Sequence, residues 1–364
     1  MLQGYYDERE KRKKDGLPSV PLSAQEVQEI ANAFENSSGD AELLNLIENE
    51  VSPGVDEAAY VKAAFLKDLA LEKTKTDLIT PQKSIEILGT MLGGYSVEAL
   101  VEILKKDKFA AEAAEALKNT ILVYDSFNEI FELSKNNSHA KSIIDSWANA
   151  EWFENKPTLD EEIKLTIYKV SGETNTDDFS PAKEAWSRPD IPLHAQAFLK
   201  FSENIDNPLD ELKKLKSDGS QLVFVGDVVG TGSSRKSAVN SMLWHMGSDI
   251  PFVPAKKTGG FCFGGKIAPI FYNTLQDSGA FPLELNVDNL EHGKKIILRP
   301  YSGEVLDDAT GNVISTFNLK TDVIFDEIRA GGRINLIIGR QLTDKTREKM
   351  GLEPSDKFLS LIHI

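Results

Sequence analysis

Cysteine is almost absent from this chain, since Cys262 is the single one among 364 residues. One thiol cannot form an internal disulfide, which favours a reducing compartment and predicts a cytoplasmic protein. One thiol also cannot ligate an iron–sulfur cluster or complete a cysteine zinc site. The five histidines show no metal-ligand spacing either. We therefore predict no metal ligands here, and interpret Cys262 as a packed residue and His194 and His245 as helix residues rather than catalysts.

Long apolar runs and an excess of basic charge are missing as well. No segment reaches the roughly 20 apolar residues that span a bilayer, so no membrane contact is expected. The N-terminus carries a Lys/Arg cluster at 9–14 but lacks the apolar stretch of a signal peptide. The net charge is −16 and the pI about 4.9, which disfavours a general nucleic-acid-binding surface. We interpret the basic cluster as a solvated helix face.

The length indicates two domains, of which the first, residues 1–156, has helical patterns almost throughout. Ser23 and Glu26 have the spacing of a capping box, and Thr80 followed by Pro81 is typical of a helix start. Short helices with apolar faces predict a stack of antiparallel helix pairs. The predicted helices include 23–34, one from 56, one from 80, one from 96, a long one over 110–131, and 138–152.

The pattern changes after a linker at 155–162. Apolar and polar residues alternate over 163–170, which predicts a strand. Strand and helix patterns then mix, so residues 157–364 are predicted to form an α/β domain. The predicted strands are 222–229, 281–287, 295–298, 313–319 and 335–338, and the predicted helices are 192–203, 208–216, 234–246, 269–278 and 322–330.

The most informative segment is 224–236, which reads FVGDVVGTGSSRK. Its apolar run stops at Gly230 and Gly232, which permit positive φ and close approach of a ligand to the backbone. Ser233, Ser234 and Arg235 follow, and then a helical pattern begins. Free N–H groups at a helix start bind anions, and hydroxyls with a guanidinium suit a carboxylate or phosphate. Arg235 favours an anion site over a plain serine-capped turn, because a cation in the first helical turn opposes the helix dipole.

Two further loops offer candidate chemistry. Residues 172–181 (GETNTDDFSP) and the following Trp186, Ser187 and Arg188 are rich in short polar side chains. They could orient a substrate, or form only Asx and Ser/Thr turns. Residues 257–266, with two glycine pairs around an apolar centre, could approach a ligand or simply connect two strands.

These segments resemble the bacterial aconitase B family. The matching motifs are PGVDEAAYVKA at 53–63, LGTMLGGY at 88–95, GETNTDD at 172–178, WSRPDIP at 186–192 and VGDVVGTGSSRK at 225–236. The resemblance covers nearly the whole chain and its motifs are highly specific. It implies an α + α/β fold: a HEAT-like all-helical domain over 1–156, then a mobile aconitase swivel domain of β/β/α type over 157–364.

The resemblance also implies a lyase of the tricarboxylic acid cycle. The family converts citrate reversibly to isocitrate through cis-aconitate, and some members hydrate 2-methyl-cis-aconitate. A [4Fe–4S] cluster binds the substrate hydroxyl and a carboxylate, and a serine alkoxide removes the α-proton. Carried over by position, the base falls on Ser233, substrate contacts on Ser234 and Arg235, and another substrate arginine on Arg188. The chemistry is consistent, because guanidinium groups grip carboxylates at two points and helix-start N–H groups stabilise an alkoxide.

The chain departs from the family pattern in two respects. The family's cluster cysteines lie in domains after this segment, so the [4Fe–4S] cofactor belongs to the full-length enzyme. Residues 354–364 differ from the family's continuation, and we interpret them as a truncation or a sequencing artefact. By itself the chain is expected to be inactive, to bind citrate weakly at best, and to carry no iron.

Two alternatives come from other functional classes. The chain could be a non-catalytic module, because the family's helical domain is associated with homodimerisation and with RNA binding by the full-length protein without its cluster. It could also be the small subunit of a split dehydratase, completed by a partner chain. Cluster domains encoded in frame downstream would indicate a truncated aconitase, and a separate gene would indicate a split enzyme.

Overall fold

The computed structural model describes residues 2–36 and 38–359. Of residues 354–364, which were predicted to differ from the family's continuation, 360–364 lie outside the described residues. The chain divides into two compact units, a helical one and a sheet-based one. The helical unit contains 1–156, 250–255 and 337–358, and the sheet unit contains 157–249 and 256–336. Within the described residues, no helix is both long and apolar enough to cross a bilayer.

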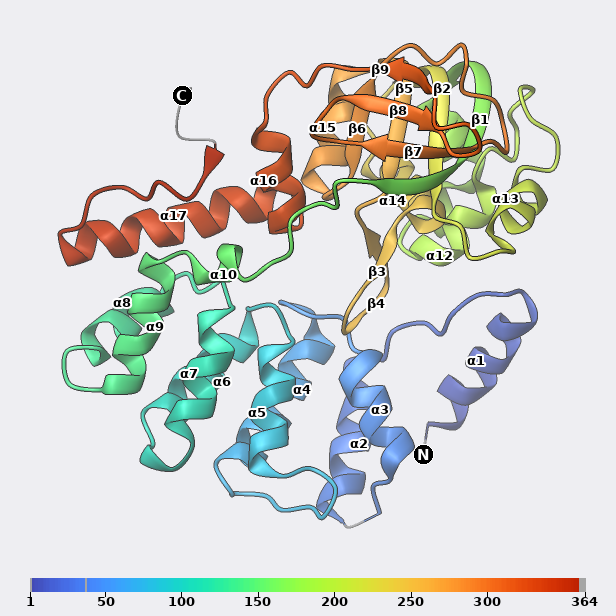
Figure 1. The fold of residues 1–364 in the computed structure, drawn as a ribbon. Coiled ribbons are helices and arrows are strands. Elements are labelled where there is room, and N and C mark those ends of the chain that lie inside the picture. The colour runs from blue at the N-terminus through green and yellow to red at the C-terminus, as the bar shows by residue number, and fades with distance from the viewer. Residues whose placement is uncertain (1, 37, 360–364) are drawn as a thin grey trace. The chain divides into compact units, whose positions relative to one another are not determined.

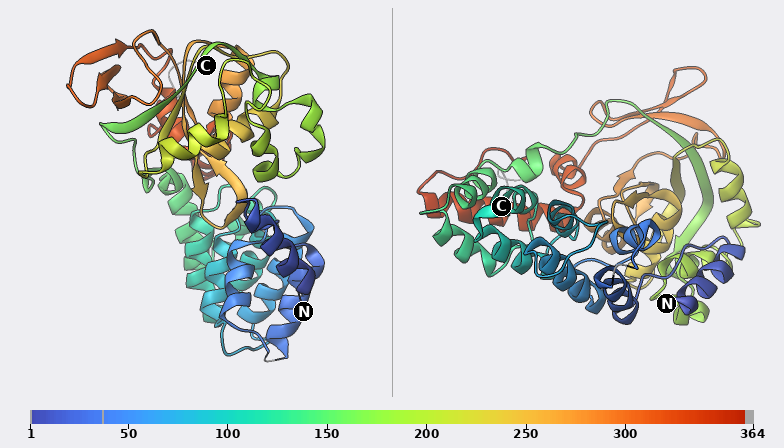
Figure 2. Two further views of the ribbon diagram at one scale, coloured as in Figure 1. Left: turned by 90° about the vertical axis from the view of Figure 1, so that its right-hand side faces the viewer. Right: turned by 90° about the horizontal axis from the view of Figure 1, so that it is seen from below.

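The helical unit is a row of short helices packed in pairs (Figures 1 and 2). Helix α4 packs against α2, α5 and α6, and α7 packs against α5, α6 and α9, so these two helices contact neighbours in two layers. The helices are α1 (Gln3–Lys14), α2 (Ala24–Glu35), α3 (Ala41–Asn49), α4 (Glu57–Ala70), α5 (Pro81–Gly89), α6 (Tyr95–Leu104), η1 (Asp107–Phe109), α7 (Ala110–Lys118), α8 (Ser126–Leu133), α9 (Ser138–Ala148) and α10 (Glu151–Glu154).

Local signals define several of these helices. Ser23 and Glu26 form the predicted capping box at α2, and the Thr80 hydroxyl caps α5 ahead of Pro81. The predicted single helix over 110–131 is wrong, because α7 ends at Lys118 and α8 begins at Ser126. Tyr124, with φ of +38°, lies between them in a backbone conformation that an α-helix does not contain.

The sheet unit is built on seven strands in the order β6-β5-β2-β1-β7-β8-β9. Strands β6, β5, β2 and β1 run parallel, and β7, β8 and β9 join them antiparallel. The strands are β1 (Ile163–Asn175), β2 (Leu222–Thr231), β5 (Phe261–Ile267), β6 (Phe281–Glu284), β7 (Lys295–Arg299), β8 (Glu304–Asp307) and β9 (Val313–Thr316), and β3 (Ser248–Ile250) pairs separately with β4 (Val253–Thr258).

Helices cover both faces of this sheet. Successive residues of each strand point to opposite sides, so neighbouring residues belong to different cores. Tyr168 and Phe224 pack in one core with α14 and α15, whereas Ile167 and Val223 pack in the other with Ile324 of α16. The helices after 156 are α11 (Thr176–Phe179), η2 (Ala182–Ser187), α12 (Ile191–His194), η3 (Ala195–Ala197), α13 (Pro208–Lys216), α14 (Lys236–Met246), α15 (Pro269–Asp277), α16 (Val323–Ala330) and α17 (Arg333–Met350).

Several predictions for this region need correction. The predicted strand at 335–338 is part of α17, whose buried positions Leu336, Leu342 and Thr346 recur at helical spacing while Ile334 and Ile337 are exposed. A short apolar run does not distinguish these two possibilities. The predicted helix at 192–203 is only α12 followed by η3, and β3, β4, β5 and β8 have no counterpart among the predicted strands. The glycine-rich stretch at 257–266 forms the end of β4, a turn and most of β5.

Candidate functional site

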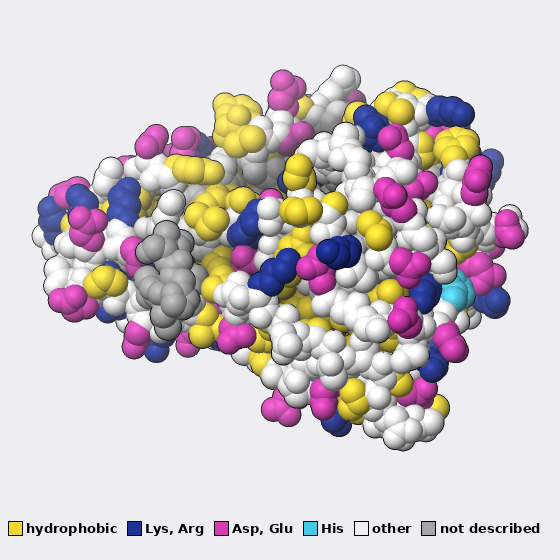
Figure 3. Space-filling view, turned by 90° about the horizontal axis from the view of Figure 1, so that it is seen from above, with side chains coloured by type: hydrophobic (Ala, Val, Ile, Leu, Met, Phe, Trp, Pro, Cys, Tyr) yellow, Lys and Arg dark blue, Asp and Glu magenta, His cyan; other side chains and the backbone are white. Residues whose placement is uncertain are grey.

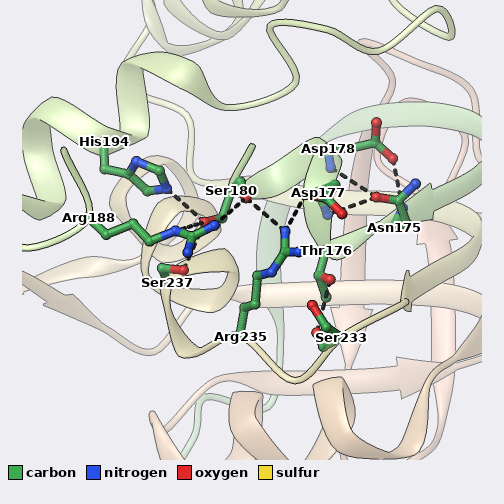
Figure 4. A network of polar contacts seen from close by, with 10 residues as sticks. All are labelled: Asn175, Thr176, Asp177, Asp178, Ser180, Arg188, His194, Ser233, Arg235 and Ser237. Carbon is green, nitrogen blue, oxygen red and sulfur yellow. Dashed lines mark hydrogen bonds and ion pairs between the residues drawn. The ribbon is translucent and has the colours of Figure 1, made fainter. Parts of the chain in front are cut away.

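The site lies where β1 and β2 end side by side. The two strands are parallel, and Asn175 at the end of β1 pairs with Thr231 at the end of β2. The segments that follow therefore leave the same edge of the sheet, as ligand-binding loops of parallel sheets do. One is α11, which starts at Thr176, and the other is the turn 231–235 that leads into α14. Figure 4 shows residues of both segments close together.

Two glycines make the second turn possible. Gly230 has φ of +78° and Gly232 has φ of +92°, both in the left-handed region. A Cβ on Gly230 would lie 2.2 Å from the ring of Phe271, and a Cβ on Gly232 would lie 3.2 Å from Thr176 Oγ1. The turn therefore packs tightly on α15 and α11, and it presents Ser233 and Ser234 as exposed residues.

Helix α14 begins two residues later than predicted. Arg235 occupies its N-cap position, so the expectation that this cation lies inside the first helical turn is wrong. No side chain of the described residues caps the helix, so its first N–H groups are available to an anion. Arg235 Nη1 contacts the carboxylate of Asp177 and donates to the Ser180 carbonyl oxygen at 3.1 Å. The bond from Arg235 holds the pKa of Asp177 below its ordinary value.

The first segment is ordered by a capping box. The Asn175 side chain accepts from the backbone N–H of Asp177 at 2.7 Å and of Asp178 at 3.1 Å, and Asp178 accepts from the Asn175 N–H at 2.8 Å. The polar loop at 172–181 thus contains the Asx-type turn that the sequence allowed. The Thr176 hydroxyl reaches across to the second turn and donates to the Ser233 carbonyl oxygen at 2.9 Å.

Arg188 approaches the same place from the end of η2. Its Nε donates to Ser180 Oγ at 3.2 Å and its Nη2 donates to the Ser180 carbonyl oxygen at 3.3 Å. Arg188 and Arg235 therefore converge on one residue, Ser180 (Figure 4). Of the four residues singled out from the sequence, Ser233, Ser234 and Arg235 share a turn, and Arg188 is linked to that turn through Ser180.

A pocket of ≈ 210 Å³ lies beside the turn. One side of it is formed by Thr176, Gly230 and residues 232–235, and the other by residues 268–271 and Thr274 of the α15 start. Arg188 does not contribute to the lining of this pocket. The pocket thus combines hydroxyls, a guanidinium and an uncapped helix start with an apolar wall.

Sequence reasoning missed the contacts that His194 and Ser237 make with the candidate loops. Ser180 Oγ lies 2.7 Å from His194 Nε2 and 2.8 Å from Ser237 Oγ, and Ser187 Oγ lies 2.8 Å from His194 Nδ1. His194 is in a helix, α12, as predicted, but its ring is buried in this polar cluster. Burial, assisted by Arg188, holds the pKa of His194 below its ordinary value. No spacing in the sequence connects these positions, because they come from the end of α11, from η2, from α12 and from α14.

The described residues do not offer a metal site. Among them, no group of three or more His, Cys, Asp or Glu side chains is arranged to hold a metal ion. Cys262 lies in β5 inside the core shared with α14 and α15, and its burial raises the pKa of its thiol. This placement agrees with its interpretation as a packed residue.

Comparisons with known proteins identify two matching family models. The model described as Aconitate B N-terminal domain matches residues 4–153, and the model described as Aconitate hydratase 2 N-terminus matches residues 165–363. The chain is 52% identical over 369 residues to Aconitate hydratase B of Escherichia coli (strain K12), covering 98% of this chain and 43% of that protein. Over 363 residues it is 52% identical to Aconitate hydratase B of Synechocystis sp., covering 99% of this chain and 42% of that protein.

The chain therefore spans less than half the length of the curated relatives it matches. Among solved structures, the crystal structure of 3-isopropylmalate dehydratase (leuD) from Methanocaldococcus jannaschii is 18% identical with a TM-score of 0.38. That comparison covers 51% of this chain and 99% of that chain.

Proposed function

Because the chain belongs to the aconitate hydratase B family, a family of hydro-lyases, we propose that it supplies the swivel half of an aconitase active site. In this role it contributes a catalytic serine and two arginines to a site that the remaining domains complete. The substrate class is a tricarboxylate: citrate, cis-aconitate or isocitrate, with 2-methylisocitrate as a related substrate. The chain alone is then inactive.

The observation that carries this proposal is the convergence of Arg188 and Arg235 on Ser180 beside an uncapped helix start. Two guanidinium groups close together attract an anion with more than one carboxylate. Within the described residues, no hydrogen bond uses Nε or Nη2 of Arg235, so this face of the guanidinium is available to a ligand. Asp177 holds its Nη1 until a substrate carboxylate arrives.

Ser233 is proposed as the base that accepts the α-proton of the substrate. A serine hydroxyl is too weakly acidic to ionise at neutral pH without help. The N–H groups at the start of α14 and the guanidinium of Arg235 would stabilise the alkoxide, as donors in an oxyanion hole do. Its neighbour Ser234 is equally exposed on the turn and is proposed to donate to a substrate carboxylate.

The [4Fe–4S] cluster that the resemblance implies does not fit the described residues of this chain. Cys262, the single cysteine, is fully buried and lacks companion ligands among the described side chains. We therefore assign the cluster to domains beyond this segment and derive no step through it. The chain's own contribution is to bind carboxylates and to hold a proton on Ser233.

We further propose that the two parts carry distinct roles. Residues 1–156 correspond to a HEAT-like domain, supported by paired short helices in two layers, and residues 157–364 to the swivel domain, supported by the mixed sheet. Dimerisation through residues 1–156, RNA binding by the full-length protein, and assembly as a split dehydratase stay predictions from the resemblance. Figure 3 shows acidic and basic side chains interspersed on one face of the molecule. The net charge of the chain is −16.

The test of the proposal is Ser233→Ala in the full-length protein. We expect turnover to fall by about two orders of magnitude or more, the range for removal of a general base, while substrate still binds. Ser217→Ala is the matched control, because Ser217 is an exposed serine at the end of α13. Unchanged turnover in Ser233→Ala would remove Ser233 from the mechanism.

A further inference from the structure

We propose that His194 is a positioning residue, whose neutral Nδ1–H tautomer orients the Ser180 hydroxyl and through it the guanidinium of Arg188. The role of Arg188 in carboxylate binding rests on the proposed function. The hydrogen-bond chain that leads to Arg188 rests on geometry alone.

The direction of the hydrogen bonds from Ser187 through His194 to Ser180 is fixed at Ser187. Ser187 Oγ lies 2.8 Å from the Glu184 carbonyl oxygen, which can only accept, so Ser187 donates its single hydrogen there. The same Ser187 Oγ lies 2.8 Å from His194 Nδ1. Because Ser187 has no second hydrogen, Nδ1 must be the donor in this contact. The His194 ring therefore carries its proton on Nδ1.

The protonation of Nδ1 also determines which groups the Ser180 hydroxyl donates to and accepts from. With Nδ1 protonated, Nε2 of neutral His194 is an acceptor, and Ser180 Oγ at 2.7 Å donates to it. The two lone pairs of Ser180 Oγ then accept from Arg188 Nε at 3.2 Å and from Ser237 Oγ at 2.8 Å. Every donor and acceptor of the Ser180 hydroxyl is used.

A charged His194 would reverse the hydrogen bonds of Ser180, and its burial opposes the charge. With Nε2 protonated, Nε2 would donate to Ser180 Oγ, and the Ser180 hydroxyl would have to turn and donate to Ser237 Oγ instead, so His194 would no longer set its direction. Both partners are shielded from water, since His194 is 1% and Ser180 is 0% exposed. The charged groups that act on the ring are Arg188 and Glu184, and Arg188 opposes its protonation.

The consequence for Arg188 is a fixed orientation. Its Nε and Nη2 are held by the hydroxyl and carbonyl of the same residue, Ser180. Within the described residues, no hydrogen bond uses its Nη1, which is therefore the nitrogen left to a ligand. Without the acceptor on His194, the Ser180 hydroxyl can rotate and Arg188 loses one of its two anchors.

The first test is nitrogen-15 NMR of the full 364-residue chain labelled at histidine and arginine. We expect the His194 ring to show the neutral Nδ1–H pattern at pH 7, assigned by its loss in His194→Gln or by elimination of the other histidines. A neutral Nε2–H pattern or a charged ring would overturn the proposal. The tautomer is read on the unmodified chain, and assignment by elimination of the other histidines does not require that His194→Gln folds.

The second test follows hydrogen exchange at Arg188 Nε, assigned by its loss in Arg188→Lys. In His194→Phe and Ser180→Ala we expect exchange to be about tenfold faster or more, the equivalent of one charge-assisted hydrogen bond. His194→Gln should restore part of the protection, because its side-chain carbonyl can accept from Ser180. Equal protection in all variants would overturn the proposal.

Citrate titration of the same proteins separates this inference from the proposed function. If Arg188 loses protection in His194→Phe but neither protein binds citrate, the positioning chain stands and the substrate assignment to this chain fails. If His194→Phe binds citrate as tightly as the unmodified chain does, and its Arg188 Nε exchanges at the same rate, the positioning role is excluded.

Discussion

Thr176 and Ser233 are joined across two strand ends, because the Thr176 hydroxyl donates to the Ser233 carbonyl oxygen at 2.9 Å. Thr176 is 2% exposed and begins α11, whereas Ser233 is exposed on the turn before α14. A buried hydroxyl thus fixes the backbone of the residue proposed as the base. The bond leaves the Ser233 side chain free for chemistry.

Thr176→Val removes this hydroxyl without changing the side-chain shape much. We expect a loss of roughly 1–2 kcal/mol in the free energy of unfolding, because the Ser233 carbonyl loses its partner. Urea unfolding of the chain measures it. Thr176→Ser is the matched control, since it keeps the hydroxyl, and equal losses in the two variants would mean that the methyl group and not the bond matters.

Gly230→Ala should be more harmful than Gly219→Ala. Both glycines have similar positive φ, +78° and +82°, so both substitutions carry the cost of a left-handed alanine. Only at Gly230 would the new Cβ meet the Phe271 ring, whereas nothing lies within 4 Å at Gly219. We expect an additional loss of about 1–3 kcal/mol for Gly230→Ala, as overpacking gives. Equal urea midpoints would show that α15 moves away without cost.

Arg188→Lys should weaken tricarboxylate binding in the full-length protein by about tenfold, visible as a higher KM. An ammonium cannot hold both oxygens of Ser180 with a planar fork and still present a further N–H to the ligand. Arg299→Lys serves as the control, because Arg299 makes a comparable two-nitrogen contact with Glu162 elsewhere on the sheet. Unaltered affinity and rate in Arg188→Lys would exclude this residue from the site.

Acid should destabilise the chain partly through His245. Burial lowers the pKa of His245 from 6.5 to about 4, with Lys216 and Lys257 acting in the same direction. Its unfolded form binds a proton below pH 6.5, while the folded form resists one, so its stabilising contribution is present above pH 6.5 and is lost as the pH falls toward 4.

The slope attributable to this residue is at most about 1.4 kcal/mol per pH unit. Urea unfolding between pH 7.5 and 5 should show a shallower pH dependence in His245→Gln, which keeps a donor for the Ala195 carbonyl oxygen that His245 Nε2 contacts at 2.9 Å. Parallel curves for the two proteins would assign the acid sensitivity to other groups.

The sequence predicted the parts of the site that depend on local backbone chemistry. Gly230 and Gly232 signalled a tight turn after a strand, and the hydroxyls and Arg235 next to it signalled an anion site, because these properties belong to consecutive residues. The same locality explains the capping box at Ser23 and the cap at Thr80. The start of the helix was predicted two residues too early, because Arg235 is the N-cap of α14 rather than a residue of its first turn.

The role of Ser180 could not be predicted, because its partners are far apart along the chain. His194, Ser237 and Arg235 reach it from α12, α14 and the preceding turn, and no periodicity links them. The prediction of a strand at 335–338 was wrong because it relied on local sequence alone. Its local apolar run was real, but tertiary packing of Leu336 and Leu342 decided that it is helical.

The oxygen that accepts from both Arg188 and Arg235 is a backbone carbonyl. Mutation at position 180 can delete the hydroxyl but leaves that carbonyl in place, so the meeting point of the two positive charges is tolerant of side-chain change. The backbone, rather than a replaceable side chain, thereby holds the two like charges of Arg188 and Arg235 near one another.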